Sequence, residues 1–313
     1  MKLLVSSLLL GLAWFALLNV LASTVAWALA HVVLRRNVRP ETLLAVRLMP
    51  ALMSATFVVA VFLPAHLRFE PAAREESFGF LLGSLAALGA VLLSRSLWRA
   101  ISAAWNDYRL AAFARRGAVP LDAGALEVRG FPGVSLAGIL RPTILVGSDT
   151  VAALTPAELD AAICHEQAHR RSRDNFKRFL MFCAPDLFGW SATAREVEDR
   201  WQAEAECQAD ARAAGGDDRR ALVLASALVK VARLTSRSTA VLPSPAWSAF
   251  HLAALLETRV RRLTAGRAPA DAGSGRLWRG LVVAAVGIAT AAWLSDGSYA
   301  LHQVTESMVT HLP

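Results

Sequence analysis

The chain has 313 residues, enough for one or two domains with a sizeable core. Hydrophobic residues make up 55% of it and charged residues only 19%, a balance that excludes an ordinary soluble protein. The formal net charge of +8 does not indicate nucleic-acid binding, because the arginines gather at the edges of apolar segments and do not alternate with aromatic residues.

Three apolar segments near the N-terminus are long enough to cross a bilayer, which takes about 20 residues in a helix. They are Leu3–Leu34, Leu43–Leu67 and Phe78–Leu97. The first could instead be a signal peptide with its small residues at Ala28–Ala30. However, it is far longer than a signal core of roughly 7–15 residues and only Lys2 precedes it, so we expect an uncleaved helix.

A fourth apolar segment, Leu281–Leu294, is shorter and is flanked by Trp278 and Trp293, which are typical interface anchors. The expected organisation is three transmembrane helices in 1–100, a polar domain in 101–264, an Ala-, Gly-, Pro- and Ser-rich linker in 265–276, a fourth transmembrane helix in 277–295 and a short tail in 296–313.

The distribution of arginines predicts an orientation in the membrane. They cluster after the first and third segments and before the fourth, whereas the loop at 68–77 is net acidic. The positive-inside rule then places both termini outside the cytoplasm and the domain at 101–264 inside it. We expect a multi-pass protein of the cytoplasmic (inner) membrane.

The polar domain contains a helix with a readable start. Thr155 supplies an N-cap, Pro156 a proline at the first helical position and Glu158 a capping-box glutamate. No helix breaker follows until about Arg171. The sequence therefore predicts one uninterrupted helix through the motif that follows.

This helix carries the segment "CHEQAH", an H-E-x-x-H motif. His165 and His169 lie one turn apart on one face, so both imidazoles can reach a single ion. Glu166 lies beside that ion, where its carboxylate can take a proton from bound water. The alternative is a solvated helix face with two ordinary histidines. The apolar neighbours Ala161 and Ile163 weigh against it, because a buried His–Glu–His face without a partner is costly.

A third ligand is expected on the helix that contains "ECQAD". Glu206 and Asp210 share a face of it at i, i+4 spacing, so Glu206 can bind the ion while Asp210 accepts the outer ring N–H of His165. Three acidic residues nearby remain rivals for the ligand role: Glu198, Asp199 and Glu204.

Between the two helices lies the apolar stretch Phe179–Trp190. It is too short to span a bilayer and is interrupted by Pro185 and Asp186, so His165 and Glu206 stay on one side of the membrane. It can be a core helix, a helix on the membrane surface or a re-entrant dip. The odd, widely spaced cysteines Cys164, Cys183 and Cys207 exclude a disulfide framework, and we expect them to be buried thiols.

The whole pattern resembles the BlaR/MecR-type antirepressor membrane metallopeptidases. The matching segments are "GILRPTILVG" at 138–147, "LTPAELDAAICHEQAHRRSRDN" at 154–175, "ECQAD" at 206–210 and "LETRVRRL" at 256–263. The resemblance implies an α-helical membrane protein with an inserted gluzincin-like α+β zinc metallopeptidase domain. It also implies Zn2+ held by His165, His169 and Glu206, Glu166 as general base and Asp210 in the outer shell.

The resemblance assigns further residues less specifically. Asp174 stands where the family carries an aspartate, and it can equally be the N-cap of a helix from Asn175. The strand at 138–146 resembles an edge that pairs with extended substrate, which makes Ile139, Leu140 and Arg141 candidate substrate-binding residues. Arg259 resembles a family arginine, or belongs to a solvated charge run. His251 is the candidate oxyanion-stabilising residue.

The chain departs from the beta-lactam sensors of this family after the fourth segment. Fewer than two dozen residues follow, without an S-x-x-K serine motif, so no beta-lactam binding is expected and the chain resembles a core-only member. We expect a zinc endopeptidase that cleaves a cytoplasmic protein, such as a transcriptional repressor or the chain itself, with no direct contact to nucleic acid. The alternatives are an HtpX-like quality-control peptidase and a non-catalytic transducer that keeps the zinc fold.

Overall fold

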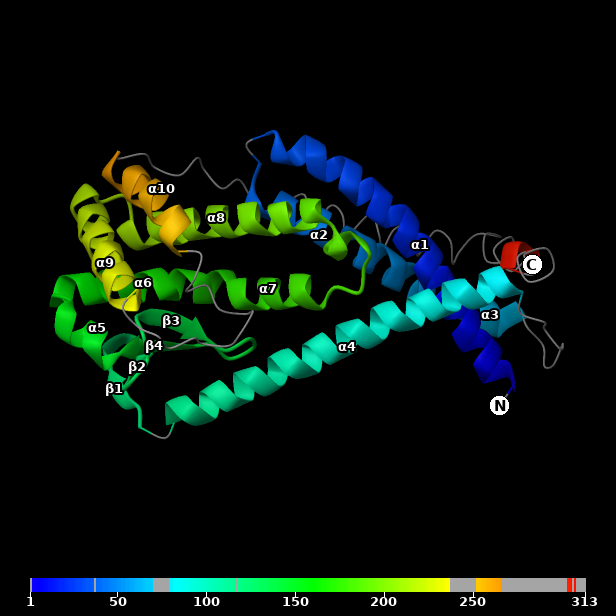
Figure 1. Cartoon of the computed structure of the whole chain (residues 1–313), viewed down its shortest axis with the longest axis horizontal. Coiled ribbons are helices and arrows are strands. Elements are labelled where there is room, and N and C mark those ends of the chain that lie inside the picture. Colours follow the sequence, from blue (N-terminus) through cyan, green and yellow to red (C-terminus); the bar gives the residue numbers. More distant parts are fainter. Residues whose placement is uncertain are drawn as a thin grey trace. The chain divides into compact units, whose positions relative to one another are not determined.

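The computed structural model of the chain describes residues 2–36, 38–69, 79–115, 117–236, 252–265, 303–305 and 307 (Figure 1). His251, the linker after 265, the fourth apolar segment and almost all of the tail lie outside these residues. The chain forms two compact units. The first comprises Met1–Trp98, Cys183–Arg200 and Ser274–Pro313, and the second Arg99–Phe182 and Trp201–Gly273.

The first unit contains the apolar helices that the sequence predicts. They are α1 (Lys2–Leu34), α2 (Pro40–Phe57) with its continuation through the π-helical turn η1 (Val58–Phe62) and α3 (Leu63–Phe69), and α4 (Phe80–Arg115). Three stretches of these helices are long and apolar enough to cross a membrane: Val5–Leu34, Pro40–Arg68 and Phe80–Ala114. The prediction of three membrane-spanning helices is confirmed to this extent, while the orientation stays a prediction.

Helix α4 is longer than expected, because it continues to Arg115 and does not end near Leu97. The added residues are mainly alanine, leucine, arginine and aromatic residues, and no proline or glycine interrupts them before Gly117. The helix therefore runs without a break from the first unit into the second.

A buried arginine organises the polar interior of the first unit. Arg47 on α2 is 1% exposed, and its Nη1 lies 3.0 Å from Oδ2 of Asp186, which is fully buried. Its Nε donates to Oε1 of Glu198 at 2.5 Å. The backbone N–H of Gly189 donates to Oδ1 of Asp186 at 2.6 Å. Such a cluster persists in an apolar interior only because each charge has an opposite charge or a donor beside it.

Two polar residues of α1 hold the same loop by its backbone. Asn19 donates from Nδ2 to the carbonyl oxygen of Pro185 at 3.0 Å and accepts from the N–H of Leu187 at 3.0 Å. Ser23 accepts from the N–H of Phe188 at 3.2 Å. Cys183–Arg200 accordingly belongs to the first compact unit, and the domain boundaries expected from the sequence stay a prediction.

The apolar stretch Phe179–Trp190 is not a single helix. Its first residues complete α7 (Asp174–Cys183), and after a non-helical turn at Pro185 the 3-10 helix η3 (Phe188–Trp190) begins. Proline lacks the N–H that would continue the helix, and the loop bonds to α1 and α2 instead.

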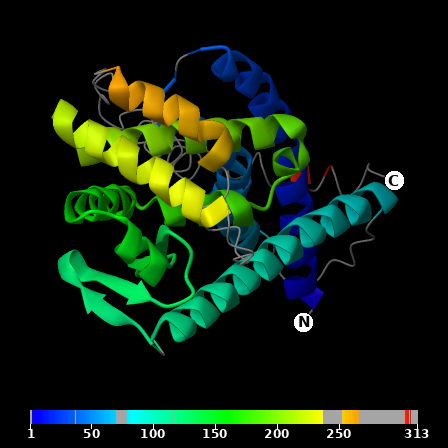
Figure 2. The same cartoon turned by 60° about the vertical axis from the view of Figure 1, so that its left-hand side comes forward.

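The second unit contains a small mixed sheet in the order β1-β2-β4-β3 (Figure 2). Its strands are β1 (Val119–Leu121), β2 (Ala125–Val128), β3 (Val134–Ala137) and β4 (Thr143–Gly147). β2 and β4 are parallel, and the other two pairs are antiparallel. The strand that the sequence predicted at 138–146 is β4. It is an interior strand and not an edge, which agrees with its continuous buried run Ile144–Gly147.

The helices of the second unit carry its functional side chains. They are α5 (Ser148–Ala153), α6 (Pro156–Ser172), α7, α8 (Ala192–Ala214), of which the part from Trp201 belongs here, α9 (Asp218–Ser236) and α10 (Leu252–Thr264). Ile163 packs α6 onto the sheet, and α10 lies beside α9 (Figure 2). The described residues are therefore mostly helical, with a small sheet in the second unit.

Candidate metal centre

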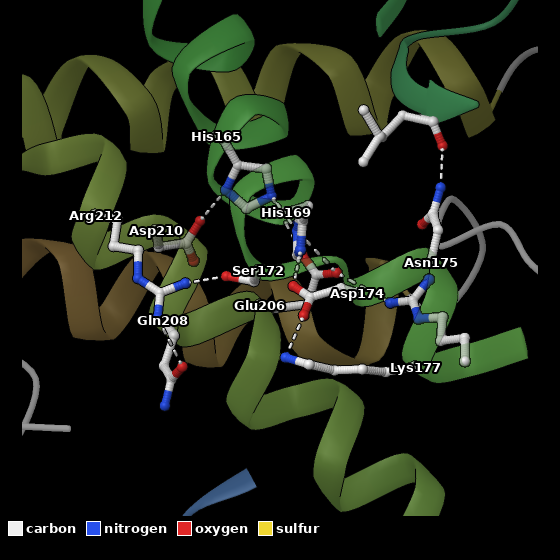
Figure 3. A network of polar contacts seen from close by, with 12 residues as sticks. His165, His169, Ser172, Asp174, Asn175, Lys177, Glu206, Gln208, Asp210 and Arg212 are labelled. Atoms are coloured by element: carbon white, nitrogen blue, oxygen red, sulfur yellow. Dashed lines mark hydrogen bonds and ion pairs between the residues drawn. The ribbon is translucent and has the colours of Figure 1, made fainter. Parts of the chain in front are cut away.

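Three buried side chains of the second unit converge on one point (Figure 3). Nε2 of His165 lies 3.1 Å from Nε2 of His169, and the two nitrogens lie 3.4 and 3.6 Å from the Glu206 carboxylate oxygens. One ligand atom from each residue can be chosen so that all lie within 4.8 Å of one another. We call these residues the metal cluster.

The local structure of α6 sets the two histidines side by side. Thr155 and Glu158 form the predicted capping box, which fixes the start of the helix and confirms that prediction. The helix ends at Arg173, whose backbone is left-handed with a φ of 55°. This reversal turns the chain into α7 and returns its first residue, Asp174, toward His169. A non-glycine residue in this conformation is strained, and the contacts around it must hold it.

Each histidine has a carboxylate on its outer nitrogen. Nδ1 of His165 lies 3.0 Å from Oδ1 of Asp210, and Nδ1 of His169 lies 2.8 Å from Oδ2 of Asp174. Asp210 thus lies beside the outer nitrogen of His165, as the prediction requires, although Nδ1 of His165 makes no hydrogen bond among the described residues, and Asp174 is hydrogen-bonded to Nδ1 of His169. These carboxylates favour the proton on Nδ1, so the neutral imidazoles turn the lone pairs of Nε2 inward.

The inward ring nitrogens and the Glu206 carboxylate form a group that could bind a metal ion. With Nε2 of His165 and Nε2 of His169 only 3.1 Å apart, one buried ring must hold an extra proton while no cation is bound, and Oε1 of Glu206 has no hydrogen-bond partner among the described residues. A buried carboxylate oxygen left without a partner is costly. A metal ion in contact with all three ligands would remove both costs. The residues present therefore fit a metal ion.

Arg259 of α10 forms ion pairs with two carboxylates at the cluster. Its side chain lies 2.6 Å from Oδ1 of Asp210 through Nη2 and 2.8 Å from Oδ2 through Nε, and Nη1 lies 3.0 Å from Oε2 of Glu206. Nη2 also lies 3.3 Å from Nε2 of His165. Arg259 is 3% exposed, so it is not part of a solvated charge run.

The charges in the cluster depend on one another. Burial would raise the pKa of Glu206, but the charges of His169 and Arg259 hold it well below its usual range. Burial likewise opposes the charged form of His169, yet Glu206 and Asp174 raise the pKa of this histidine to about 10 in the metal-free protein. Glu206 is therefore ionised at neutral pH, ready to serve as a ligand.

Glu166 differs from the carboxylates around it. It is 7% exposed, and its Oε2 has no hydrogen-bond partner in the described part of the chain. Burial raises the pKa of this carboxyl above its ordinary 4.5. A carboxylate with a raised pKa and a free oxygen is suited to accept a proton.

Two of the rival acidic residues are engaged elsewhere. Glu198 pairs with Arg47 in the first unit, and Glu204 lies 3.6 Å from Nη1 of Arg262. Among the described residues, the only group placed to hold a metal is the one containing Glu206.

The candidate substrate-binding residues lie in the turn between β3 and β4. Ile139, Leu140 and Arg141 line a cavity of about 710 Å³, and Leu140 is 79% exposed. The opposite wall comes from α4, including Tyr108. Their role in binding substrate stays a prediction, and His251 lies outside the described residues.

Sequence reasoning missed two residues of α7 that belong to this region. Asn175 donates from Nδ2 to the carbonyl oxygens of Leu136 and Gly138, at 2.8 and 2.9 Å, and so ties the end of β3 to α7. Arg178 reaches Glu206, with Nη2 3.6 Å from Oε1. The spacing held a signal for Arg178, because it follows Asp174 by one helical turn and shares its face.

The three cysteines form no disulfide, as expected. They are half-buried and not fully buried as predicted. None belongs to the metal cluster.

Scans against protein-family models, curated proteins and solved structures give no match for this chain.

Proposed function

We propose that the chain is a membrane-bound zinc endopeptidase with its active site at the metal cluster. One observation carries the proposal: two histidines one turn apart and a glutamate converge, each histidine is held by an outer carboxylate, and Glu166 lies beside them with an unpaired oxygen. A purely structural site would need no such base.

The distances support zinc as the metal. Four ligands at about 2.0–2.1 Å around a tetrahedral ion stand about 3.3 Å from one another. The two Nε2 atoms of His165 and His169 are 3.1 Å apart, and each lies 3.4 or 3.6 Å from a different carboxylate oxygen of Glu206, with one ligand atom per residue within 4.8 Å of the others. Two histidines and one glutamate, with the fourth position open, are a ligand set of catalytic zinc sites.

The chemistry follows from what the side chains can do. A zinc ion bound there would polarise a peptide carbonyl and lower the pKa of bound water toward about 7. Oε2 of Glu166 takes a proton from the water whose oxygen bonds to the carbonyl carbon. The same carboxyl returns a proton to the leaving nitrogen as the C–N bond breaks. Asp210 and Asp174 keep the two imidazoles oriented throughout.

The proposed substrate is a cytoplasmic protein, such as a transcriptional repressor or the chain itself. This part rests on the resemblance to the BlaR/MecR-type peptidases and on the arginine distribution, which puts the second unit on the cytoplasmic side. The membrane helices would keep the enzyme at the cytoplasmic membrane.

Metal content tests the proposal first. Purified wild-type protein is expected to hold about one zinc per chain, and Glu206→Ala to lose most of it, because three protein ligands are needed for tight binding. Elemental mass spectrometry measures both. Glu204→Ala is the matched control, two residues away on α8, and should retain its zinc. Zinc-free wild type that is well folded would overturn the proposal, and zinc retained in Glu206→Ala would move the third ligand elsewhere.

Zinc binding to the metal-free protein is expected to release protons at pH 7. The raised pKa of His169 means that its protonated form stabilises the metal-free fold, fully below about pH 6.5 and no longer once pH passes about 10. A zinc ligand must be neutral imidazole, so uptake displaces this proton and affinity rises with pH. Calorimetric titration in two buffers of different ionisation enthalpy gives the number of protons. Equal heats in both buffers would contradict the expectation.

A further inference from the structure

Arg178 is a buried cation whose donors are mostly unused. It lies on α7 and is 9% exposed. Its Nε and Nη2 have no hydrogen-bond partner among the described residues, and the ion pair from Nη2 to Oε1 of Glu206 is 3.6 Å long. A hydrogen bond of this type would measure about 2.7–3.2 Å. The guanidinium therefore keeps hydrogen-bonding capacity at the metal cluster.

The second arginine at the cluster behaves differently. Arg259 engages both oxygens of Asp210 and Oε2 of Glu206 at 2.6–3.0 Å. Arg178 instead lies over the ring of Trp201, with its Cζ 5.8 Å from the ring centroid, and makes the long contact to Glu206. A neutralising partner for Glu206 is thus already present in Arg259, and charge balance alone does not explain a second buried guanidinium.

The unused donors lie beside the reacting centre. Oε1 of Glu206 is 3.6 Å from Nη2 of Arg178 and 3.6 Å from Nε2 of His169, so the guanidinium and the ligand histidine flank the same oxygen. A small anion at the cluster would meet a fixed, planar donor group that cannot lose its proton. Buried donors of this kind bind oxyanions with short, charge-assisted hydrogen bonds.

We propose that Arg178 is the oxyanion-binding residue of this site. The inference rests on the proposed peptidase function. As water adds to the scissile carbonyl carbon, negative charge gathers on the carbonyl oxygen, and the N–H groups of Arg178 donate to it. Donors placed at such an oxygen contribute about 10²–10³-fold to kcat in other hydrolases. His251, the residue that the sequence offered for this role, is then not required for it.

Inorganic phosphate, a tetrahedral oxyanion, is the probe for a test that does not depend on turnover. Binding is measured calorimetrically on full-length protein in detergent, with the zinc content of each sample determined beside it. Arg178→Met is expected to weaken phosphate binding about tenfold or more, because a charged donor is lost. Arg178→Lys keeps the positive charge but lacks the planar guanidinium, and it is expected to lose less phosphate affinity than Arg178→Met. Arg212→Met is the control, because Arg212 is an exposed arginine of α8 that donates to Ser172 and Gln208 and does not contact the metal cluster in the described part of the chain (Figure 3).

Each outcome decides the inference. Phosphate binding in Arg178→Met equal to wild type, or no phosphate binding by wild type, overturns it, whatever the zinc content. Weaker binding in Arg178→Met in samples that lack zinc would keep the anion site and remove the peptidase proposal. If Arg178→Met does not fold, Arg178→Lys decides, with unchanged affinity overturning the inference. Where a cleavable peptide is found, the two Arg178 variants should lose kcat with little change in KM, which loss of a merely structural contact would not produce.

Discussion

Replacing Glu166 with glutamine is expected to lower kcat for peptide hydrolysis by about 10²–10⁴-fold and to leave the zinc content at the wild-type value. The amide fills the same space but cannot accept a proton, and the three residues of the metal cluster stay in place. The variant retains a buried polar group, so its stability should change little. Initial rates on a casein-derived peptide pool, measured in detergent beside elemental analysis of the same samples, check both halves of the expectation.

Gln167→Ala is the control for that experiment, because Gln167 follows Glu166 on α6 and does not belong to the metal cluster. Its rate should match wild type. Full activity in Glu166→Gln would show that another group takes the proton. A loss of zinc together with activity would mean that Glu166 supports the ligands, and its role as a base would then have no support from this variant.

Replacing Arg47 with leucine is expected to destabilise the first unit by about 3–5 kcal/mol, which is the cost of removing one member of a buried ion pair. Asp186 is fully buried and would keep its charge with only the N–H of Gly189 beside it. Loss of Arg47 costs less at Glu198, because the Glu198 side chain is 35% exposed and its carboxylate can be solvated by water. Unfolding titrations with sodium dodecyl sulfate on protein in mild detergent micelles measure the loss.

Two further variants test whether the loss of stability comes from the unpaired buried charge. Arg35→Leu removes an exposed arginine just after α1 and should change the unfolding free energy by less than about 0.5 kcal/mol. The double variant Arg47→Leu with Asp186→Leu removes both buried charges and should recover part of the stability. A single variant Arg47→Leu as stable as wild type would mean that this ion pair does not hold the loop to α2.

Local patterns were enough to predict the core of the metal site. The capping box, the i, i+4 spacing of His165 and His169 and that of Glu206 and Asp210 all act within one helix, and helical geometry fixes which side chains share a face. The three apolar helices follow in the same way from segment length. These features need no knowledge of which helix packs on which.

Contacts between distant parts of the chain were beyond this reasoning. Arg47 stands near one end of the apolar segment Leu43–Leu67, and only the fold brings it to Asp186 and Glu198, more than a hundred residues later. The strand pairing that puts β4 in the interior of the sheet is equally non-local, because the sequence of a short apolar strand does not show whether it is an edge or an interior strand. For Arg178 the spacing places the side chain on the same helix face as Asp174, but it does not tell which other helix covers that face and buries the guanidinium.

The two hydrogen bonds of Asn175 have a consequence for how accessible the edge of the sheet is to another strand. β3 is the last strand of its sheet, and an open strand edge is a template on which strands of other molecules can pair and aggregate. Asn175 occupies the outward carbonyl oxygens of Leu136 and Gly138, so an incoming strand finds these acceptors already taken. The Asn175 side chain thus blocks two hydrogen-bond acceptors of β3 and also fixes the end of this strand. A polypeptide that pairs with β3 must displace Asn175 or bind at other residues of the strand.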